Sequence, residues 1–156
     1  VIAPRHPSRL EEIESLISES NFNHSIRSKG QPITKKTNIY VLDTIGELAS
    51  IYRLKPITIM GGSFTVGGHN IIEPARYESL VIYGPDMSNF AEISSEFLQH
   101  NASIQADSWE KLEEILSESL SMDKKSISYY TKAAFKIIKS KQEIPDIYLK
   151  SLEKYL

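Results

Sequence analysis

The sequence of 156 residues contains no cysteine. That absence excludes disulfides, thiolate nucleophiles and cysteine-bound metals, and it fits a reducing compartment such as the cytoplasm. No stretch reaches the ~18 consecutive apolar residues of a membrane span, so we expect a soluble fragment without a transmembrane helix. Eighteen basic and twenty acidic residues leave a net charge of -2, which disfavours nucleic acid as a partner.

Two phosphate-binding motifs and the common metal motifs are also missing. Gly62 and Gly67 have the spacing of a Walker loop, but Gly68 and His69 stand where that loop requires lysine and a hydroxyl residue. Since no G-x-G-x-x-G occurs either, an ATPase or a dinucleotide-dependent dehydrogenase is poorly supported. His6 and His69 lack partners at metal-ligand spacing, and neither H-E-x-x-H nor D-x-D is present, so we predict no metal.

The opening segment, VIAPRHP, has neither an initial methionine nor the features of a signal peptide. It is typical of the end of a buried strand, and we interpret the chain as a piece of a longer protein. From the length we expect one domain over residues 1–156, with a core over 1–120 and helices over 121–156.

Short apolar runs rich in β-branched residues alternate with helical patterns along the chain. This alternation predicts an α/β, Rossmann-like fold with a parallel sheet flanked by helices. The strand candidates are residues 1–3, 39–42, 57–60, 80–83 and 102–105. The helix candidates are residues 8–22, 44–53, 71–78, 89–100 and 109–120, followed by two helices in the tail. The polar segment 23–38 is predicted to be a long connection without chemistry.

The chemically informative residues fall in three loops after predicted strands: APRHPSR, LDTIGEL and GGSFTVGGHNIIEPA. In a sheet of this class such loops emerge at one edge, where ligands bind. Arg5 and His6 lie between two prolines that hold their backbone extended, and Arg5 supplies a planar fork for a phosphate or carboxylate. A surface ion pair is the alternative for Arg5. Bare amides and a helix N-terminus in the third loop can hold an anion; a tight turn is the alternative there.

The same loops match helix-capping patterns, in which polar side chains bond to the free amides of a first turn. The candidate pairs are Ser8 with Glu11, Thr44 with Glu47, and Asn70 with Glu73, and Ser108 is a candidate cap for the helix at Trp109. Capping does not account for Gly46, because glycine in a helical turn costs ~1 kcal/mol relative to alanine. We therefore expect another group to approach the backbone closely at Gly46.

The order of the motifs PRHP, LDT-x-GEL, GGS…GGHN-x-x-EPA and GP…NF resembles the carboxyl-terminal half of the Kdo transferases. Members of that family move 3-deoxy-D-manno-octulosonic acid (Kdo) from CMP-Kdo onto the lipid A precursor in Gram-negative envelope assembly. The resemblance extends from Val1 to about Ile115. It implies one half of a GT-B glycosyltransferase, in which two Rossmann-like domains face a cleft and the carboxyl-terminal domain binds the nucleotide donor.

Carried over residue by residue, the resemblance implies donor contacts in all three loops. They are Pro4, Arg5, Ile45, Gly46, Glu47, Asn70, Ile71, Ile72 and Glu73. The implied cleft-lining residues are His6, Ser63, Gly67, Gly68 and His69. No catalytic residue is implied here, since the base belongs to the amino-terminal domain, so we expect this chain to bind CMP or CMP-Kdo without transferring Kdo.

The resemblance also implies an inverting, metal-independent transfer with no cofactor besides the donor CMP-Kdo. The implied partners are the amino-terminal domain and the lipid A precursor, and the implied location of the full-length enzyme is the cytoplasmic face of the inner membrane. Two other interpretations stay open: a GT-B glycosyltransferase or epimerase that uses a UDP-sugar, and a non-catalytic α/β binding module. The latter needs an acidic cluster or partner surface, and only the isolated Asp43 and Asp86 stand out.

Overall fold

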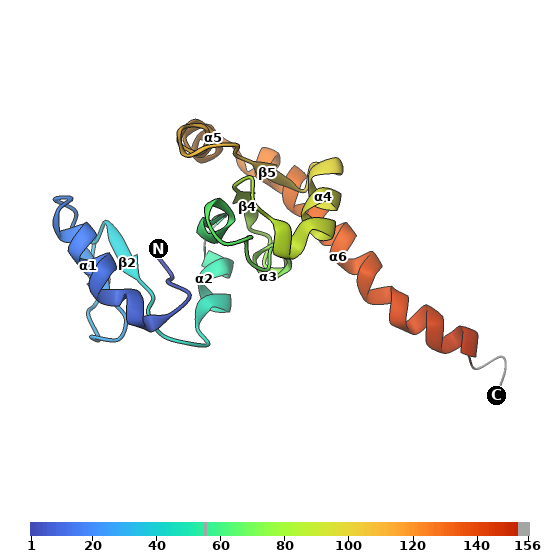
Figure 1. Cartoon of the computed structure of the whole chain (residues 1–156), viewed down its shortest axis with the longest axis horizontal. Helices are drawn as coiled ribbons and strands as arrows, with labels where there is room; N and C mark the ends of the chain where they lie inside the picture. Colours follow the sequence, from blue (N-terminus) through green and yellow to red (C-terminus); the bar gives the residue numbers. More distant parts are fainter. Residues whose placement is uncertain (55, 153–156) are drawn as a thin grey trace. The chain divides into compact units, whose positions relative to one another are not determined.

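The computed structural model describes residues 1–54 and 56–152. The chain forms two compact units, Val1–Ile51 and Tyr52–Leu156, and the division falls within helix α2 (Leu48–Leu54). Each unit is built from parallel strands and helices (Figure 1), which confirms the predicted α/β class. The expectation of a single domain stays a prediction. Among the described residues, no helix combines the length and apolar character that crossing a membrane takes.

The first unit contains the short helices η1 (Pro7–Arg9) and α1 (Leu10–Ser18) and the strands β1 (His24–Ile26) and β2 (Ile39–Val41). The two strands pair in parallel, and Ile2 forms a parallel bridge to Val41. Ile13 and Ile17 lie one helical turn apart on α1, so both side chains reach the buried side of the strands. The core of this unit consists of Ile13, Ile17, Ile26 and Val41.

Strand β1 lies inside the segment that the sequence predicts to be an unstructured connection, and that prediction is wrong. The three residues of β1 include one apolar side chain, Ile26, so their pattern carries no strand signal. The polar Ser25 is buried because its hydroxyl donates to the carbonyl of Pro32 (3.0 Å). Ser25 thus occupies a buried strand position at which an apolar residue is expected, and its hydroxyl has a hydrogen-bond partner there.

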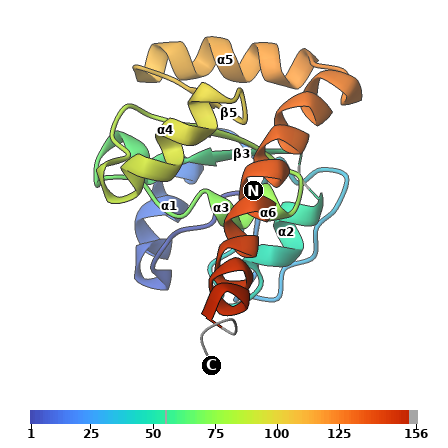
Figure 2. The ribbon, with the colours of Figure 1, turned by 90° about the vertical axis from the view of Figure 1, so that its right-hand side faces the viewer.

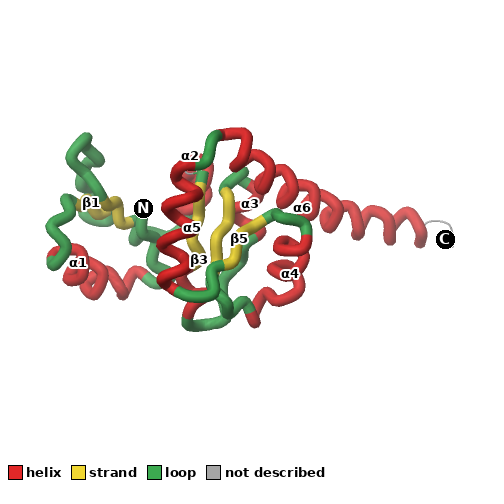
Figure 3. The backbone as a smooth tube through the Cα atoms, turned by 90° about the horizontal axis from the view of Figure 1, so that it is seen from above, coloured by secondary structure: helices red, strands yellow, loops and turns green. Residues whose placement is uncertain are grey.

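The second unit contains one parallel sheet of three strands in the order β3 (Ile57–Met60), β4 (Leu80–Tyr83) and β5 (Ser103–Gln105). These strands match the predicted runs closely. Helices α3 (Ile72–Arg76), α4 (Ala91–Gln99) and α6 (Lys124–Leu152) pack on one face, and α5 (Trp109–Ser121) covers the other (Figures 2 and 3). Two 3₁₀ turns, η2 (Gly61–Phe64) and η3 (Ser88–Phe90), follow β3 and β4.

Strand β4 is the centre of this unit, and its four side chains are fully buried. Leu80 and Ile82 belong to the cluster beneath α5, whereas Val81 and Tyr83 belong to the cluster beneath α4 and α6. Burial on both faces explains why β4 is a continuous apolar run rather than an alternating one. The tail forms the single helix α6, which continues away from the sheet (Figure 1), rather than the two helices predicted.

Two of the predicted helix starts differ in the structure, and a third is confirmed. Helix α2 begins at Leu48 rather than at residue 44, and Thr44 donates its hydroxyl to the Glu47 carboxylate instead of capping an amide. Helix α1 has no side-chain cap, so the capping box predicted at Ser8 is not formed. The cap at Ser108 is confirmed, because its hydroxyl accepts from the amide of Lys111 (3.2 Å).

Candidate functional site

Two of the three informative loops belong to the first unit and leave adjoining parallel segments. The amide of Ile2 donates to the Tyr40 carbonyl (2.8 Å), and the amide of Leu42 donates to the Ile2 carbonyl (2.9 Å). Parallel segments end at the same edge, so the loop that begins at Pro4 and the loop that begins at Asp43 emerge together. The structure therefore brings the first two predicted groups to one edge of this unit.

The first loop presents its polar side chains outward. Arg5 and His6 are exposed, and Pro4 is half-buried. The backbone of His6 is extended (φ -124°, ψ 129°), as the flanking prolines predict. Among the described residues, no hydrogen bond or ion pair engages the Arg5 guanidinium. Its alternative role as a surface ion pair is thus unsupported, and its donors are available to an anion.

The second loop holds Glu47 in a fork of hydrogen bonds. The guanidinium of Arg27 donates to both carboxylate oxygens, with Nε 2.9 Å from Oε2 and Nη2 2.6 Å from Oε1. The hydroxyl of Thr44 also donates to the carboxylate. The bonds from Arg27, followed by that from Thr44, lower the pKa of Glu47 to about 2. Glu47 is therefore an ionised acceptor with a fixed orientation at neutral pH.

A buried carboxylate of the second loop, that of Asp43, binds the turn that follows β1. Asp43 is 6% exposed and accepts from the amide (2.9 Å) and hydroxyl (2.5 Å) of Ser28. Burial alone would raise the pKa of Asp43, but the two bonds from Ser28 outweigh it and the pKa is lowered. The buried charge is stable here because both oxygens have donors.

The backbone angle of Gly46 accounts for a glycine at this position, and the expected close approach of another group stays a prediction. Gly46 precedes α2 and has a φ of +89°, a region that L-residues with a side chain rarely adopt. An ideal Cβ placed on it has no neighbour within 4 Å among the described residues. Glycine is therefore required by the backbone angle and not by a close protein contact. Ile45 beside it is 86% exposed.

The third loop, in the second unit, curls around one carbonyl. The Gly62 carbonyl accepts from the amides of Thr65 (3.3 Å), Val66 (2.9 Å) and Gly68 (3.2 Å). The Gly67 amide bonds to the Asp86 carboxylate, whose pKa is lowered mainly by Ser88 and to a smaller extent by this amide. These four amides already have partners, so the expectation that they form a bare anion cradle is wrong for this stretch of the loop.

The glycines of this loop allow other side chains to approach closely. A Cβ on Gly62 would lie 2.6 Å from Nε2 of His69, and Gly67 (φ +83°) lies directly against Asn89. The side-chain amide of Asn89 donates to the Val66 carbonyl (2.9 Å), and its backbone amide donates to the Gly67 carbonyl (3.0 Å). Since Asn89 opens helix α4 through η3, the third loop and the start of α4 form one assembly.

Ser63 fixes the base of the third loop. Its side chain is fully buried, its hydroxyl donates to the Met60 carbonyl, and it accepts from the Gly84 amide (2.5 Å). The hydroxyl thus joins the ends of β3 and β4. Ser63 was predicted to line a cleft; in the structure it supports the loop from beneath and presents no surface.

The end of the third loop forms a short turn of helix. Asn70 is exposed and its side-chain oxygen accepts from the Ile72 amide (3.0 Å), but helix α3 begins at Ile72 and its N-cap, Ile71, has no side-chain cap, so the predicted cap at Asn70 is displaced by one residue. Glu73 is exposed in the first turn of α3, and Ile71 is fully buried. Helix α3 has five residues instead of the predicted eight, so little helix dipole is available to an anion. Burial, assisted by the charge of Glu73, raises the pKa of Tyr52 to about 12.

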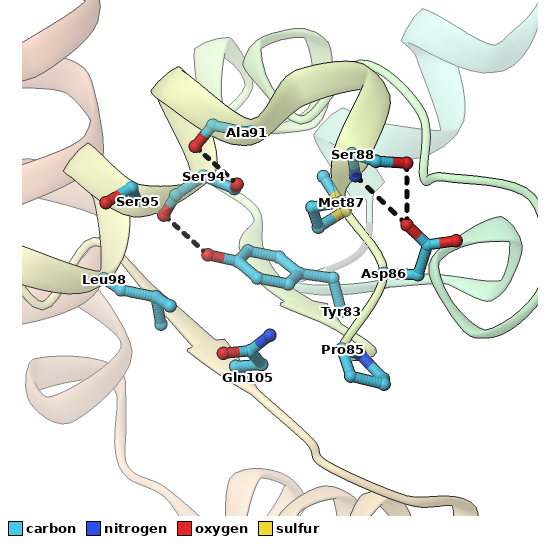
Figure 4. Close-up of a pocket in the computed structure, with 10 residues that line it drawn as sticks. All are labelled: Tyr83, Pro85, Asp86, Met87, Ser88, Ala91, Ser94, Ser95, Leu98 and Gln105. Atoms are coloured by element: carbon cyan, nitrogen blue, oxygen red, sulfur yellow. Dashed lines mark hydrogen bonds between the residues drawn. The ribbon is translucent and has the colours of Figure 1, made fainter.

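A hollow of about 360 Å³ lies at the carboxyl ends of β4 and β5, beside α4 (Figure 4). The Tyr83 ring lies along its floor, where the phenol donates to the Ser94 carbonyl (2.8 Å) and accepts from the Ser103 hydroxyl (3.1 Å). Asp86 and Gln105 also line it. None of the predicted donor contacts does.

Sequence reasoning missed two residues that shape the loops. Arg27 lies in the segment to which no chemistry was assigned, and its partner Glu47 is twenty residues away. Asn89 belongs to the NF motif, but the motif alone gave no reason for an amide there. Metal-ligating side chains do not gather in groups of three or more anywhere in the part of the chain described.

Comparison with known proteins gives a consistent result, although no family model matches. The chain is 33% identical over 160 residues to a 3-deoxy-D-manno-octulosonic acid transferase of Rickettsia felis, covering 100% of this chain and 34% of that protein. It is 38% identical over 104 residues to a probable mitochondrial 3-deoxy-D-manno-octulosonic acid transferase of Arabidopsis thaliana, covering 65% of this chain and 23% of that protein. The chain thus spans about a third or less of the length of these curated relatives.

A solved structure is similar over most of the chain. It is the C-terminal CMP-Kdo binding domain of WaaA from Acinetobacter baumannii, with a TM-score of 0.81 and 32% sequence identity. The match covers 86% of this chain and 70% of that one. Sequence and fold therefore agree on the same group of proteins.

Proposed function

The chain belongs to the Kdo transferase family, and we propose that it is the donor-binding half of a glycosyltransferase that moves Kdo from CMP-Kdo to a lipid A precursor. The observation that carries this proposal is the 32% identity and TM-score of 0.81 to a CMP-Kdo binding domain. We take residues 1–156 together as one donor-binding domain, with helices after residue 120.

The proposed donor contacts follow from the chemistry of CMP-Kdo, which has a phosphate, a sugar carboxylate, a ribose diol and a cytosine amine. Arg5 is exposed and has no partner among the described residues, so it is suited to one of the two anions. Glu47 and Glu73 are acceptors for ribose hydroxyls or the cytosine amine. The remaining proposed contacts are Pro4, Ile45, Gly46, Asn70 and Ile72, with His6, Gly67, Gly68 and His69 lining the cleft; the fully buried Ile71 supports this turn from the core.

We propose an inverting displacement at the anomeric carbon of Kdo. A carboxylate base from the amino-terminal domain removes the proton of the acceptor hydroxyl, while the donor-side residues of this chain stabilise the departing CMP. A single phosphate that faces an arginine does not require a divalent cation, so the transfer is metal-independent and needs no cofactor. The full-length enzyme works at the cytoplasmic face of the inner membrane, where its lipid acceptor is made.

Calorimetric titration with CMP, without added metal, tests this proposal, with UMP and AMP as competing ligands. We expect saturable binding of CMP that Arg5→Ala and Glu73→Ala both weaken. Lys111→Ala and Glu92→Ala are the matched controls, because both residues are exposed and lie outside the three loops. They should bind CMP as the unmodified chain does.

Three results would count against the proposal. A preference for UMP would favour an enzyme that uses a UDP-sugar. A folded chain that binds none of the three nucleotides, alone or joined to the amino-terminal half of a relative, would favour a non-catalytic binding module. Kdo transfer by the 156 residues alone would show that the base is not in another domain.

A further inference from the structure

We propose that Arg27 is a positioning residue for the donor: it holds the Glu47 carboxylate in the orientation in which Glu47 accepts from a hydroxyl or amine of the nucleotide. This inference rests on the proposed function, because it takes Glu47 to be a donor contact. Arg27 lies in the polar segment that sequence reasoning left without a role. The substrate class concerned is a nucleoside monophosphate that carries a ribose diol.

The guanidinium restrains both oxygens of the carboxylate at once. Nη2 of Arg27 lies 2.6 Å from Oε1 of Glu47, and Nε lies 2.9 Å from Oε2 and 3.1 Å from Oε1. The Thr44 hydroxyl also donates to Oε2. A planar fork on two oxygens fixes the rotation of the carboxylate as well as its position. The Glu47 side chain is still 37% exposed, so part of it faces solvent and a ligand.

The backbone of Arg27 is held in place independently of this ion pair. Its amide donates to the Val41 carbonyl (2.9 Å), and its carbonyl accepts from the amide of Gly30 (3.0 Å), which has a φ of +64°. The next residue, Ser28, is bound to the buried Asp43. Isolated surface ion pairs are weak partly because both side chains must be ordered. Here the two loops are already joined, so the pair forms between groups whose main chains are fixed.

The surrounding charges favour the same arrangement. Glu47 raises the pKa of Arg27, with a smaller contribution from Tyr40, so the guanidinium stays charged. Lys29 is engaged with Glu14 (2.6 Å) and does not compete for Glu47. An ionised carboxylate can only accept hydrogen bonds, and a ribose diol or cytosine amine supplies donors. Arg27 therefore sets both the charge and the direction of the acceptor.

A double-mutant cycle with CMP as the ligand separates positioning from direct contact. In the 156-residue chain, Arg27→Gln should weaken CMP binding roughly tenfold, a size typical of residues within one hydrogen-bond network. In a Glu47→Gln background the same change should have less than about a twofold effect, because the group that Arg27 positions is altered already. Arg27→Lys keeps the charge without the fork and should restore only part of the affinity. Lys111→Gln, which breaks the exposed pair with Glu114, is the matched control and should leave affinity unchanged.

A second measurement reports on Glu47 without any ligand. The ¹³C shift of its carboxyl carbon, followed against pH, reports the pKa of Glu47. We expect a pKa of about 2 in the unmodified chain and a clearly higher pKa in Arg27→Gln. Lys111→Gln should leave that titration in place. Amide spectra of each variant verify that the chain is folded, and Arg27→Lys provides the test if Arg27→Gln does not fold.

The outcomes distinguish the two proposals. An unmodified chain that binds no CMP, either alone or joined to the amino-terminal half of a relative, overturns the proposed function and, with it, this role for Arg27. An unmodified chain that binds CMP, with Arg27→Gln binding equally well, overturns the role of Arg27 alone. Equal losses from Arg27→Gln in both backgrounds would also overturn it, because they would mean that the guanidinium contacts the nucleotide directly.

Discussion

The first and second units hold their loops by different physical means. In the first, a core of four buried aliphatic residues supports loops that are joined by charged and hydroxyl side chains such as Asp43 and Arg27. In the second, a fully buried strand β4 separates two apolar clusters, and the glycine-rich loop is packed against them. The comparison indicates that the geometry of the first unit depends on charge, whereas that of the second depends on burial.

The largest expected effect tests burial in the second unit. Phe97 is fully buried in the cluster between the sheet, α4 and α6, so Phe97→Ala removes its contacts and leaves a cavity. We expect a loss of ~3–5 kcal/mol in the free energy of unfolding, measured by chemical denaturation. Phe135→Ala is the control, since Phe135 is 51% exposed. Equal losses for the two variants would contradict the assigned core.

A smaller loss is expected when the buried charge of the first unit is removed. Asp43→Ala leaves the Ser28 amide without its acceptor, which costs ~2 kcal/mol. Hydrogen exchange resolved by residue should show faster exchange at residues 27–30 and no change in β4. Asp107→Ala, an exposed residue in the second unit, should leave both regions as they are. Faster exchange in β4 after Asp43→Ala would remove the distinction between the units.

The backbone of the second loop gives the next test. Gly46→Ala forces a side chain into a left-handed conformation and should cost ~1 kcal/mol in unfolding free energy. Gly61→Ala is a closely matched control: Gly61 also has open space around an added Cβ, but its φ is outside the left-handed region. Thermal unfolding should therefore separate the two variants. Equal melting temperatures would show that strain at Gly46 is relieved by movement of the loop.

The smallest effect expected is a response to acid in the first unit. The pKa of Glu47 is about 2 in the folded chain against an ordinary value of 4.5, so the folded state favours the charged form. The resulting stabilisation is complete above the ordinary value and is lost as the pH falls from about 4.5 to about 2. Hydrogen exchange between these pH values should increase at residues 43–47 before it increases in β4. Simultaneous opening of both regions would contradict this order.

The sequence predicted the second unit better than the first, for physical reasons. Strands β3 to β5 are contiguous apolar runs, and a run buried on both faces is visible in a single sequence. Strand β1 is not, because Ser25 is buried through a hydrogen bond to a residue seven positions away. Backbone angles cannot be read from a single sequence either. Gly46 has a φ of +89°, and helix α2 begins after it, at Leu48 rather than at residue 44.

The candidate site was predictable as motifs rather than as interactions. Arg5 was placed correctly as an exposed group on an extended segment, because two prolines define that backbone locally. The pairing of Arg27 with Glu47 was not predictable, since it depends on the parallel pairing of β1 with β2. Ser63 is a polar residue in a glycine-rich loop, which is typical of a binding residue. Its side chain is nevertheless fully buried, and only the three-dimensional packing reveals that.

The hydroxyl of Ser63 has a consequence for the kinetics of recognition. Because it ties the third loop to the ends of β3 and β4, the conformational entropy of that loop is lost when the chain folds and not when a ligand arrives. Preorganised surfaces of this kind lose less free energy to ordering on association. A ligand that docks on this loop meets it in its final shape, and encounter rather than loop rearrangement then limits the rate of association.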